Sequence, residues 1–173
     1  MITQERIFLV VGAVLAVLLQ VILAPHIGLV GIVPNILVAY CMAAAVAHPQ
    51  SYGCVMPFVL GLFFDLFTGG PVGVMALSLM VFSVAAARIF DTINNDTLFM
   101  PLLALGVGVL LIELSYAMFL LLFGYPASLF DAIAYRVVPC FLYDLVIGIV
   151  LYPLAKRYLA PAGVIRSELT QLR

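Results

Sequence analysis

Long runs of apolar residues with very few charges cover almost the entire chain. Charged residues make up 9% of the 173 residues, whereas soluble domains carry about 25%. So few charges cannot cover a water-facing surface, and a helix that crosses a membrane needs about 20 mainly apolar residues. We therefore expect an integral membrane protein in which residues 1–173 form a single polytopic membrane domain.

Proline, glycine and short polar clusters divide this apolar sequence into six stretches. Pro25, the pair His48-Pro49 and the turn Gly69-Gly70-Pro71 are such interruptions, because both residue types break regular structure. The alternating pattern of transmembrane β-strands is not seen. The sequence predicts an all-α bundle of about six transmembrane helices, at about residues 7–24, 32–47, 52–67, 72–90, 98–123 and 137–154.

A short polar segment precedes the sixth stretch. Ser128 and Asp131 have the [ST]-x-x-[DE] spacing of a helix start, where the hydroxyl and the carboxylate bind free backbone amides. The spacing predicts a short helix at the membrane surface that leads into the sixth span.

Lysine and arginine are distributed unequally over the predicted loops. With six spans, Arg136 lies on one side, and all other basic residues lie on the opposite side: Arg6, Arg88, Lys156, Arg157, Arg166 and Arg173. Cytoplasmic loops carry the excess of basic residues. We expect both termini in the cytoplasm.

Small residues and one carboxylate recur every four residues in the third stretch, at Gly53, Pro57, Gly61, Asp65 and Gly69. This spacing places them on one slowly drifting helical face. Small residues let helix backbones approach closely in lipid, where packing holds helices together.

The second stretch has a similar series at Asn35, Ala39, Ala43 and Ala47. We expect the two small-residue faces either to meet each other or to bind a partner helix. Ordinary packing within the bundle remains the simpler explanation.

Four ionisable residues lie within or at the edge of the predicted spans: Asp65, Glu113, Arg136 and Asp144. A charge at the bilayer centre costs about 3 kcal/mol or more, so each should be paired, protonated or next to a polar cavity. Asp65 and Arg136 are both expected near the outer edge, where an ion pair is plausible. Glu113 and Asp144 are expected at similar depth, and two touching carboxyl groups would share one proton.

These ionisable residues have two alternative interpretations. They could form a polar network that joins helices or subunits, or they could be part of a proton or transport path through Glu113 and Asp144. The sequence contains no row of ionisable groups across the full thickness, which favours the network.

Catalytic chemistry has little support in the sequence. His26 and His48 lack metal-ligand spacing, and the serines lack a neighbouring base. The cysteines Cys41, Cys54 and Cys140 lie in apolar stretches and indicate neither a disulfide framework nor a metal site. A net charge of -1 also argues against nucleic acid as a partner. We expect no catalytic, cofactor-binding or metal site.

The segment from Pro34 to Ala87 resembles the bacterial rod-shape-determining MreD family. Pro34-Asn35 matches the dipeptide that opens the family's second span, and Gly61-Leu62-Phe63-Phe64-Asp65 matches its G-L-x-x-D sequence, followed by a small-residue turn up to Gly73. The resemblance implies a non-catalytic subunit of the cell-elongation machinery, in the bacterial inner membrane, that maintains rod shape. It also implies binding to the scaffold protein MreC and, through MreC, to MreB and the peptidoglycan polymerase RodA with its transpeptidase.

The MreD family is in turn similar to the substrate-binding subunits of energy-coupling-factor vitamin transporters. That likeness implies their six-helix fold and supplies an alternative function, vitamin binding. Such subunits dock a transport partner through small residues on the first helix, where this chain has Gly12 and Ala16.

Overall fold

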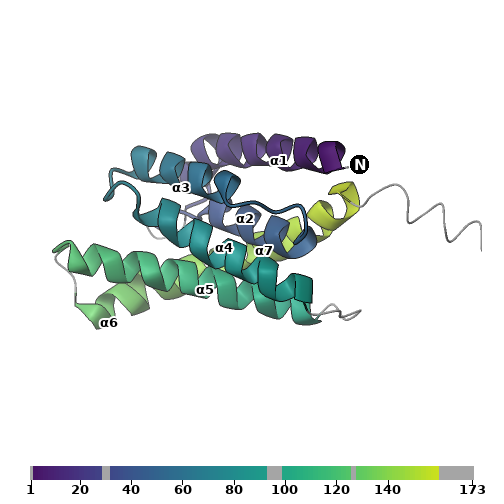
Figure 1. The fold of residues 1–173 in the computed structure, drawn as a ribbon. Helices are drawn as coiled ribbons and strands as arrows, with labels where there is room; N and C mark the ends of the chain where they lie inside the picture. The colour runs from purple at the N-terminus through teal and green to yellow at the C-terminus, as the bar shows by residue number, and fades with distance from the viewer. Residues whose placement is uncertain (1, 29–31, 93–98, 126–127, 160–173) are drawn as a thin grey trace, which may run out of the picture.

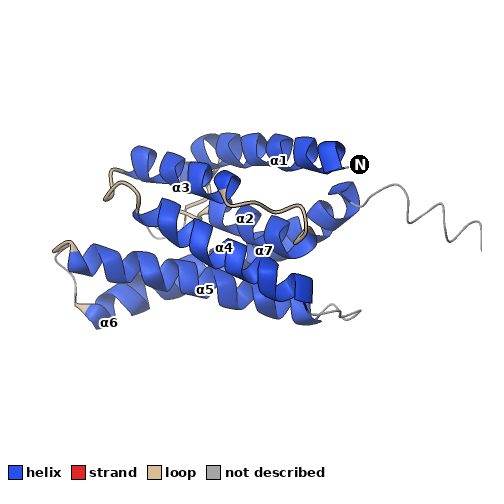
Figure 2. Ribbon diagram, viewed as in Figure 1, coloured by secondary structure: helices blue, strands red, loops and turns tan. Residues whose placement is uncertain are grey.

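The structure, a computed structural model, describes residues 2–28, 32–92, 99–125 and 128–159, and within these ranges all regular elements are helical (Figure 2). The all-α prediction is therefore confirmed for the described residues. The helices are α1 (Ile2–Ile22), α2 (Ile36–Ala47), α3 (Val55–Thr68), α4 (Val74–Thr92), α5 (Phe99–Leu122), α6 (Leu129–Ala132) and α7 (Val138–Leu159), with a 3-10 turn at Ala24–His26 and a π-helical segment at Ile133–Val137.

Among the described residues, four helical segments are long and apolar enough to cross a membrane: Arg6–His26, Val74–Thr92, Phe99–Leu122 and Leu129–Arg157. Helices α2 and α3 are also apolar but have 12 and 14 residues, or about 18 and 21 Å. A hydrocarbon core is about 30 Å thick. These two helices are shorter than the predicted stretches because α2 starts only after Asn35 and α3 only at Val55. Six complete spans therefore stay a prediction.

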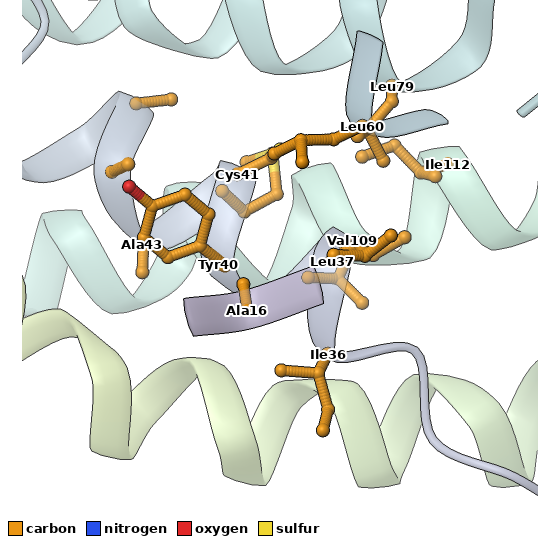
Figure 3. Close-up of a cluster of buried hydrophobic side chains, with 14 of the residues drawn as sticks. Ala16, Ile36, Leu37, Tyr40, Cys41, Ala43, Leu60, Leu79, Val109 and Ile112 are labelled. Carbon is orange, nitrogen blue, oxygen red and sulfur yellow. The ribbon is translucent and has the colours of Figure 1, made fainter. Parts of the chain in front are cut away.

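Helix α2 lies at the centre of the bundle, in contact with α1, α4, α5 and α7 (Figure 1). All residues from Ile36 to Val46 are buried. Figure 3 shows side chains of this helix within a cluster that includes Leu79 of α4 and Ile112 of α5. A helix that is apolar on all sides is typical of such a central position. The small series that includes Ala39 and Ala43 thus packs within the bundle.

Helix α1 packs on α2 around Tyr40. The Tyr40 hydroxyl donates a hydrogen bond to the backbone oxygen of Leu9 over 2.6 Å. A Cβ atom at Gly12 would lie 2.6 Å from the same hydroxyl oxygen, so the missing side chain makes room for the tyrosine. Ala16 is buried as well. The small pair Gly12 and Ala16 therefore packs inside the bundle.

Helices α3 and α4 form a tight hairpin with its closest approach at Gly61. A Cβ atom at Gly61 would lie 2.5 Å from Ala76 Cα and 2.7 Å from Ala76 N. Backbone atoms cannot rotate away, so a side chain at Gly61 would push the helices apart. The expectation that the small face of α3 meets that of α2 is wrong at Gly61, because this residue packs on α4.

The predicted small-residue face of the third stretch is shorter than expected. Pro57, Gly61 and Asp65 are buried in α3. Gly69 ends the helix with a φ of 67°. Gly53 precedes the helix, is exposed, and has no described atom within 4 Å of its Cβ position. The prediction that Gly53 is a close-approach position is wrong, because the four-residue spacing extends beyond the helix.

The predicted helix start before the sixth stretch is confirmed. Ser128 Oγ accepts a hydrogen bond from the backbone N–H of Asp131 over 3.1 Å and donates to Asp131 Oδ2 over 2.6 Å. Helix α6 then continues through the π-helical segment Ile133–Val137 into α7. The end of α7 and the start of α1 lie at one end of the bundle, and α6 lies at the other (Figure 1).

Replacement of Gly61 by alanine is expected to destabilise the α3–α4 hairpin by about 1–3 kcal/mol, because the new methyl group overpacks against backbone. The measurement is resistance of the purified protein to unfolding by sodium dodecyl sulfate. Gly106→Ala is the matched control, since its nearest neighbour beyond its own helix would be Leu145 Cδ1 at 3.6 Å, an ordinary contact. Equal resistance of the two variants would contradict the close approach at Gly61.

Candidate functional site

The carboxylate of Asp65 belongs to α3 but caps the start of α4. Its Oδ2 atom accepts hydrogen bonds from the backbone N–H groups of Gly73 over 2.8 Å, Met75 over 3.1 Å and Ala76 over 3.3 Å. Its Oδ1 atom lies 3.2 Å from Met75 N. The Asp65 side chain is completely buried, with 0% exposure. One side chain thus connects the two helices of the hairpin.

This arrangement supplies the hydrogen-bond acceptors that the start of a helix needs inside a membrane. The first N–H groups of a helix have no partner within it, and the hydrocarbon core supplies no water. A carboxylate satisfies the amides, and its charge is favourable beside the positive end of the helix dipole. Gly69 and Gly73 have φ angles of 67° and 99°, which glycine adopts easily, and so allow the tight reversal that brings α4 to Asp65.

Arg136 lies in the π-helical segment before α7. Its guanidinium carbon is 5.0 Å from the centre of the Tyr116 ring on α5, a cation–π geometry. Tyr116 also makes an edge contact with Phe64 of α3, with 6.1 Å between ring centres. The predicted ion pair between Asp65 and Arg136 is wrong, because Asp65 binds the amides of α4 and Arg136 stacks on Tyr116.

The start of α2 is held by side chains from α1 and α7. The N–H group of Asn35 donates to Asp144 Oδ1 over 2.6 Å, and that of Ile36 donates to Gln20 Oε1 over 2.6 Å. Gln20 Nε2 in turn donates to the backbone oxygen of Pro34 over 3.2 Å. Asn35 Oδ1 accepts from the N–H of Val38 over 3.3 Å as the helix cap. Three helices are therefore joined at the Pro34-Asn35 dipeptide.

Glu113 of α5 interacts with Asp144 of α7. Both are buried, with 3% and 0% exposure. The two carboxyl groups lie together as predicted, and their depth in a membrane stays a prediction. Two adjacent carboxyl groups repel each other when both are ionised, so the protonation of either group affects how α5 and α7 pack together.

Two polar atoms of this group have no hydrogen-bond partner of standard geometry among the described residues, namely Asn35 Nδ2 and Asp144 Oδ2. Within the same residues, no three His, Cys, Asp or Glu side chains gather as metal ligands. The contacts of Asn35, Ile36, Gln20 and Asp144 show that this group joins helices by hydrogen bonds.

A long apolar groove runs between α1 and α3, with a volume of roughly 800 Å³. Val10 and Val14 line its α1 side, and Val59 and Phe63 line its α3 side. Arg6 lies among the lining residues at the start of α1.

The predicted site residues fall into two groups and one outlier. The first group lies around the start of α4 and the neighbouring α5 and contains Gly61, Asp65, Gly69, Gly73 and Arg136. The second group lies around the start of α2 and contains Pro34, Asn35, Glu113 and Asp144. Gly53 belongs to neither group and lies in the loop before α3. Both groups bring together residues that are distant in the sequence.

Three contributors were missed by the sequence analysis. Gln20 is the only polar side chain in the first apolar stretch, which was a usable signal. Tyr116 receives Arg136 on its ring, and Gly70 makes room for it, because a Cβ there would lie 2.6 Å from the Tyr116 hydroxyl oxygen. Tyr116 carries no distinctive sequence pattern, and Gly70 was recognised only as part of the turn Gly69-Gly70-Pro71.

Comparison with known proteins identifies a family. The family model described as rod shape-determining protein MreD matches residues 1–161. No curated protein and no solved structure matches the chain significantly.

Replacement of Asp65 by alanine is expected to lower the free energy of unfolding by about 3 kcal/mol or more, because several buried amides lose their acceptor. Resistance to sodium dodecyl sulfate measures this loss. Asp131→Ala is the matched control: it removes another carboxylate near a helix start, but an exposed one. A loss for Asp65→Ala no larger than that of the control would show that the cap on α4 is unimportant.

Glu113→Gln and Asp144→Asn are expected to show non-additive effects on stability. The coupling energy should be between about 0.5 and 3 kcal/mol, since the two side chains interact directly. A double-mutant cycle measures it from the unfolding of both single variants and the double variant. The cycle of Asp144→Asn with the exposed Asp131→Asn should be additive, and equal coupling in both cycles would rule out a specific carboxyl pair.

Proposed function

Since the chain belongs to the MreD family of rod shape-determining proteins, we propose that it acts as a non-catalytic membrane subunit of the cell-elongation machinery that binds the scaffold protein MreC. The family match shows a role in rod-shape determination, and the four long apolar helices fit a membrane protein. The proposed mechanism is binding: the subunit holds MreC and so helps to position or activate peptidoglycan synthesis.

The observation that carries the proposal is the apolar groove between α1 and α3. Its lining residues on α1 extend from Arg6 to Leu18, about 18 Å along the helix. An α-helix with side chains is about 10–12 Å wide, and helices associate in lipid by packing into matching surfaces. The resemblance implies that MreC has a single spanning helix, and the groove suits such a partner.

The position of α3 supports a preformed groove. Its buried face is fixed to α4 through Gly61 and Asp65. Val59 and Phe63, on the groove side, are exposed. Because one face is anchored to the hairpin, the other keeps a constant shape for a partner helix.

The proposed orientation places both termini in the cytoplasm, in the inner membrane. Arg6 lies near the start of α1, Arg88 near the end of α4, and Lys156 and Arg157 near the end of α7, and the α1 start and α7 end lie at one end of the bundle (Figure 1). Such an excess of basic residues marks a cytoplasmic side. Arg166 and Arg173 lie outside the described residues. MreB, RodA and its transpeptidase would then be reached through MreC.

Vitamin binding, as in energy-coupling-factor transporters, has weaker support. A vitamin site would need convergent polar side chains in a cavity, whereas the groove between α1 and α3 is lined almost entirely by apolar residues. The six-helix fold of those subunits remains part of the proposal for architecture only.

Val14→Trp and Val59→Trp should reduce co-purification of MreC at least about tenfold, because a bulky ring fills the groove and overpacks the partner by more than about 1.4 kcal/mol. Both valines are exposed, so the variants should fold. The measurement is the amount of MreC recovered with the tagged protein in mild detergent, together with cell shape.

The control is Val146→Trp, which places the same ring on an exposed position of α7 outside the groove. It should leave MreC recovery and rod shape unchanged. If all three variants retain MreC equally, the groove is not the binding surface. If even the unmodified protein recovers no MreC, binding to MreC itself is wrong.

A further inference from the structure

A second hollow lies between α5 and α7, near the start of α5 and the end of α7. Its volume is roughly 410 Å³, within the range of small-molecule sites. Its walls are formed by Leu102 of α5 and by Ile149, Tyr152 and Pro153 of α7. We call it the α5–α7 groove.

The lining of the α5–α7 groove is amphipathic along its length. Ile149 and Leu102 supply an apolar portion, and Lys156 and Arg157 supply two cations. Both basic side chains are exposed. Ile149 and Lys156 are seven residues apart, or about 10 Å along the helix. None of the lining residues is acidic, so the local charge is positive.

The position along α7 places the cations where a membrane surface begins. The apolar sequence of α7 ends at Leu154-Ala155 and is followed by Lys156-Arg157. Basic side chains near a helix end extend to the headgroup level, with their stems along apolar surface. The apolar part of the groove then lies at acyl-chain depth and the two cations at phosphate depth.

We propose that the α5–α7 groove binds an anionic phospholipid, with an acyl chain along Leu102 and Ile149 and the headgroup phosphate between Lys156 and Arg157. The charge complementarity selects this occupant. A wholly apolar partner helix would leave the two cations unused, and a zwitterionic lipid would gain less from them. Basic pockets between membrane helices recognise anionic headgroups by this attraction.

The test counts bound lipids by native mass spectrometry on the full chain, purified in detergent and supplied with phosphatidylglycerol or phosphatidylcholine. The unmodified protein should retain phosphatidylglycerol preferentially. The double variant Lys156→Gln with Arg157→Gln should bind it about tenfold to thirtyfold more weakly, since two cations are lost. No preference between the two lipids would overturn the proposal.

A second variant tests the apolar part without a change in charge. Ile149→Trp keeps both cations but fills the groove, and it should weaken retention of phosphatidylglycerol about tenfold. Retention by Ile149→Trp at the unmodified level would mean that the cations attract lipid nonspecifically, which contradicts a groove site.

Two matched controls lie outside the groove. Arg88→Gln removes an exposed cation of α4, and Val146→Trp adds the same ring elsewhere on α7. Both should retain phosphatidylglycerol at the unmodified level, and a loss by Arg88→Gln equal to that of the double variant would overturn the proposal. Glycerol phosphate, added as a soluble competitor, should not displace the lipid. Displacement would show a site for phosphate alone.

Discussion

Backbone amides at the starts of α2 and α4 cannot rely on water, and side chains from other helices satisfy them. Asp65 of α3 accepts the amides at the start of α4, and Asp144 of α7 with Gln20 of α1 accepts those at the start of α2. An unsatisfied amide in hydrocarbon costs several kcal/mol. The requirement therefore decides which helices lie next to each other, since each acceptor must be brought to a particular helix start.

The same hydrogen bonds determine which surfaces stay free for partners. Asp65 and Gly61 commit one face of α3 to α4. Gln20 and the Tyr40 hydroxyl commit one face of α1 to α2. The remaining faces of α1 and α3 border the groove of roughly 800 Å³. Its shape therefore depends in part on the polar contacts that fix α3 to α4 and α1 to α2.

The sequence predicts which buried polar residues join the helices better than it predicts the partners of those residues. Asp65, Glu113 and Asp144 stand out because ionisable residues are rare in apolar stretches. Residue spacing gives depth along a helix, and so the adjacency of Glu113 and Asp144 is predictable. The direction in which a helix faces depends on tertiary packing, and for this reason Asp65 was wrongly paired with Arg136.

The positions of helix ends account for the other differences between the sequence analysis and the structure. The four-residue series suggests that Gly53 belongs to the packed face, but α3 begins only at Val55. The second apolar stretch was expected from residue 32, yet Asn35 caps a helix of 12 residues. Gln20 was overlooked because its partner, the start of α2, lies at a position that apolar composition does not reveal.

Specific binding in lipid needs more than apolar surface, because lipid tails cover such surface equally well. The two grooves offer different additional sources of binding specificity. The groove between α1 and α3 has a shape that is fixed by anchored helices, which favours a rigid partner such as a helix. The α5–α7 groove is smaller, roughly 410 Å³, and carries Lys156 and Arg157, so charge provides the selectivity. A mainly apolar groove with a single cation at one end therefore favours a different kind of partner from a short apolar channel beside two cations.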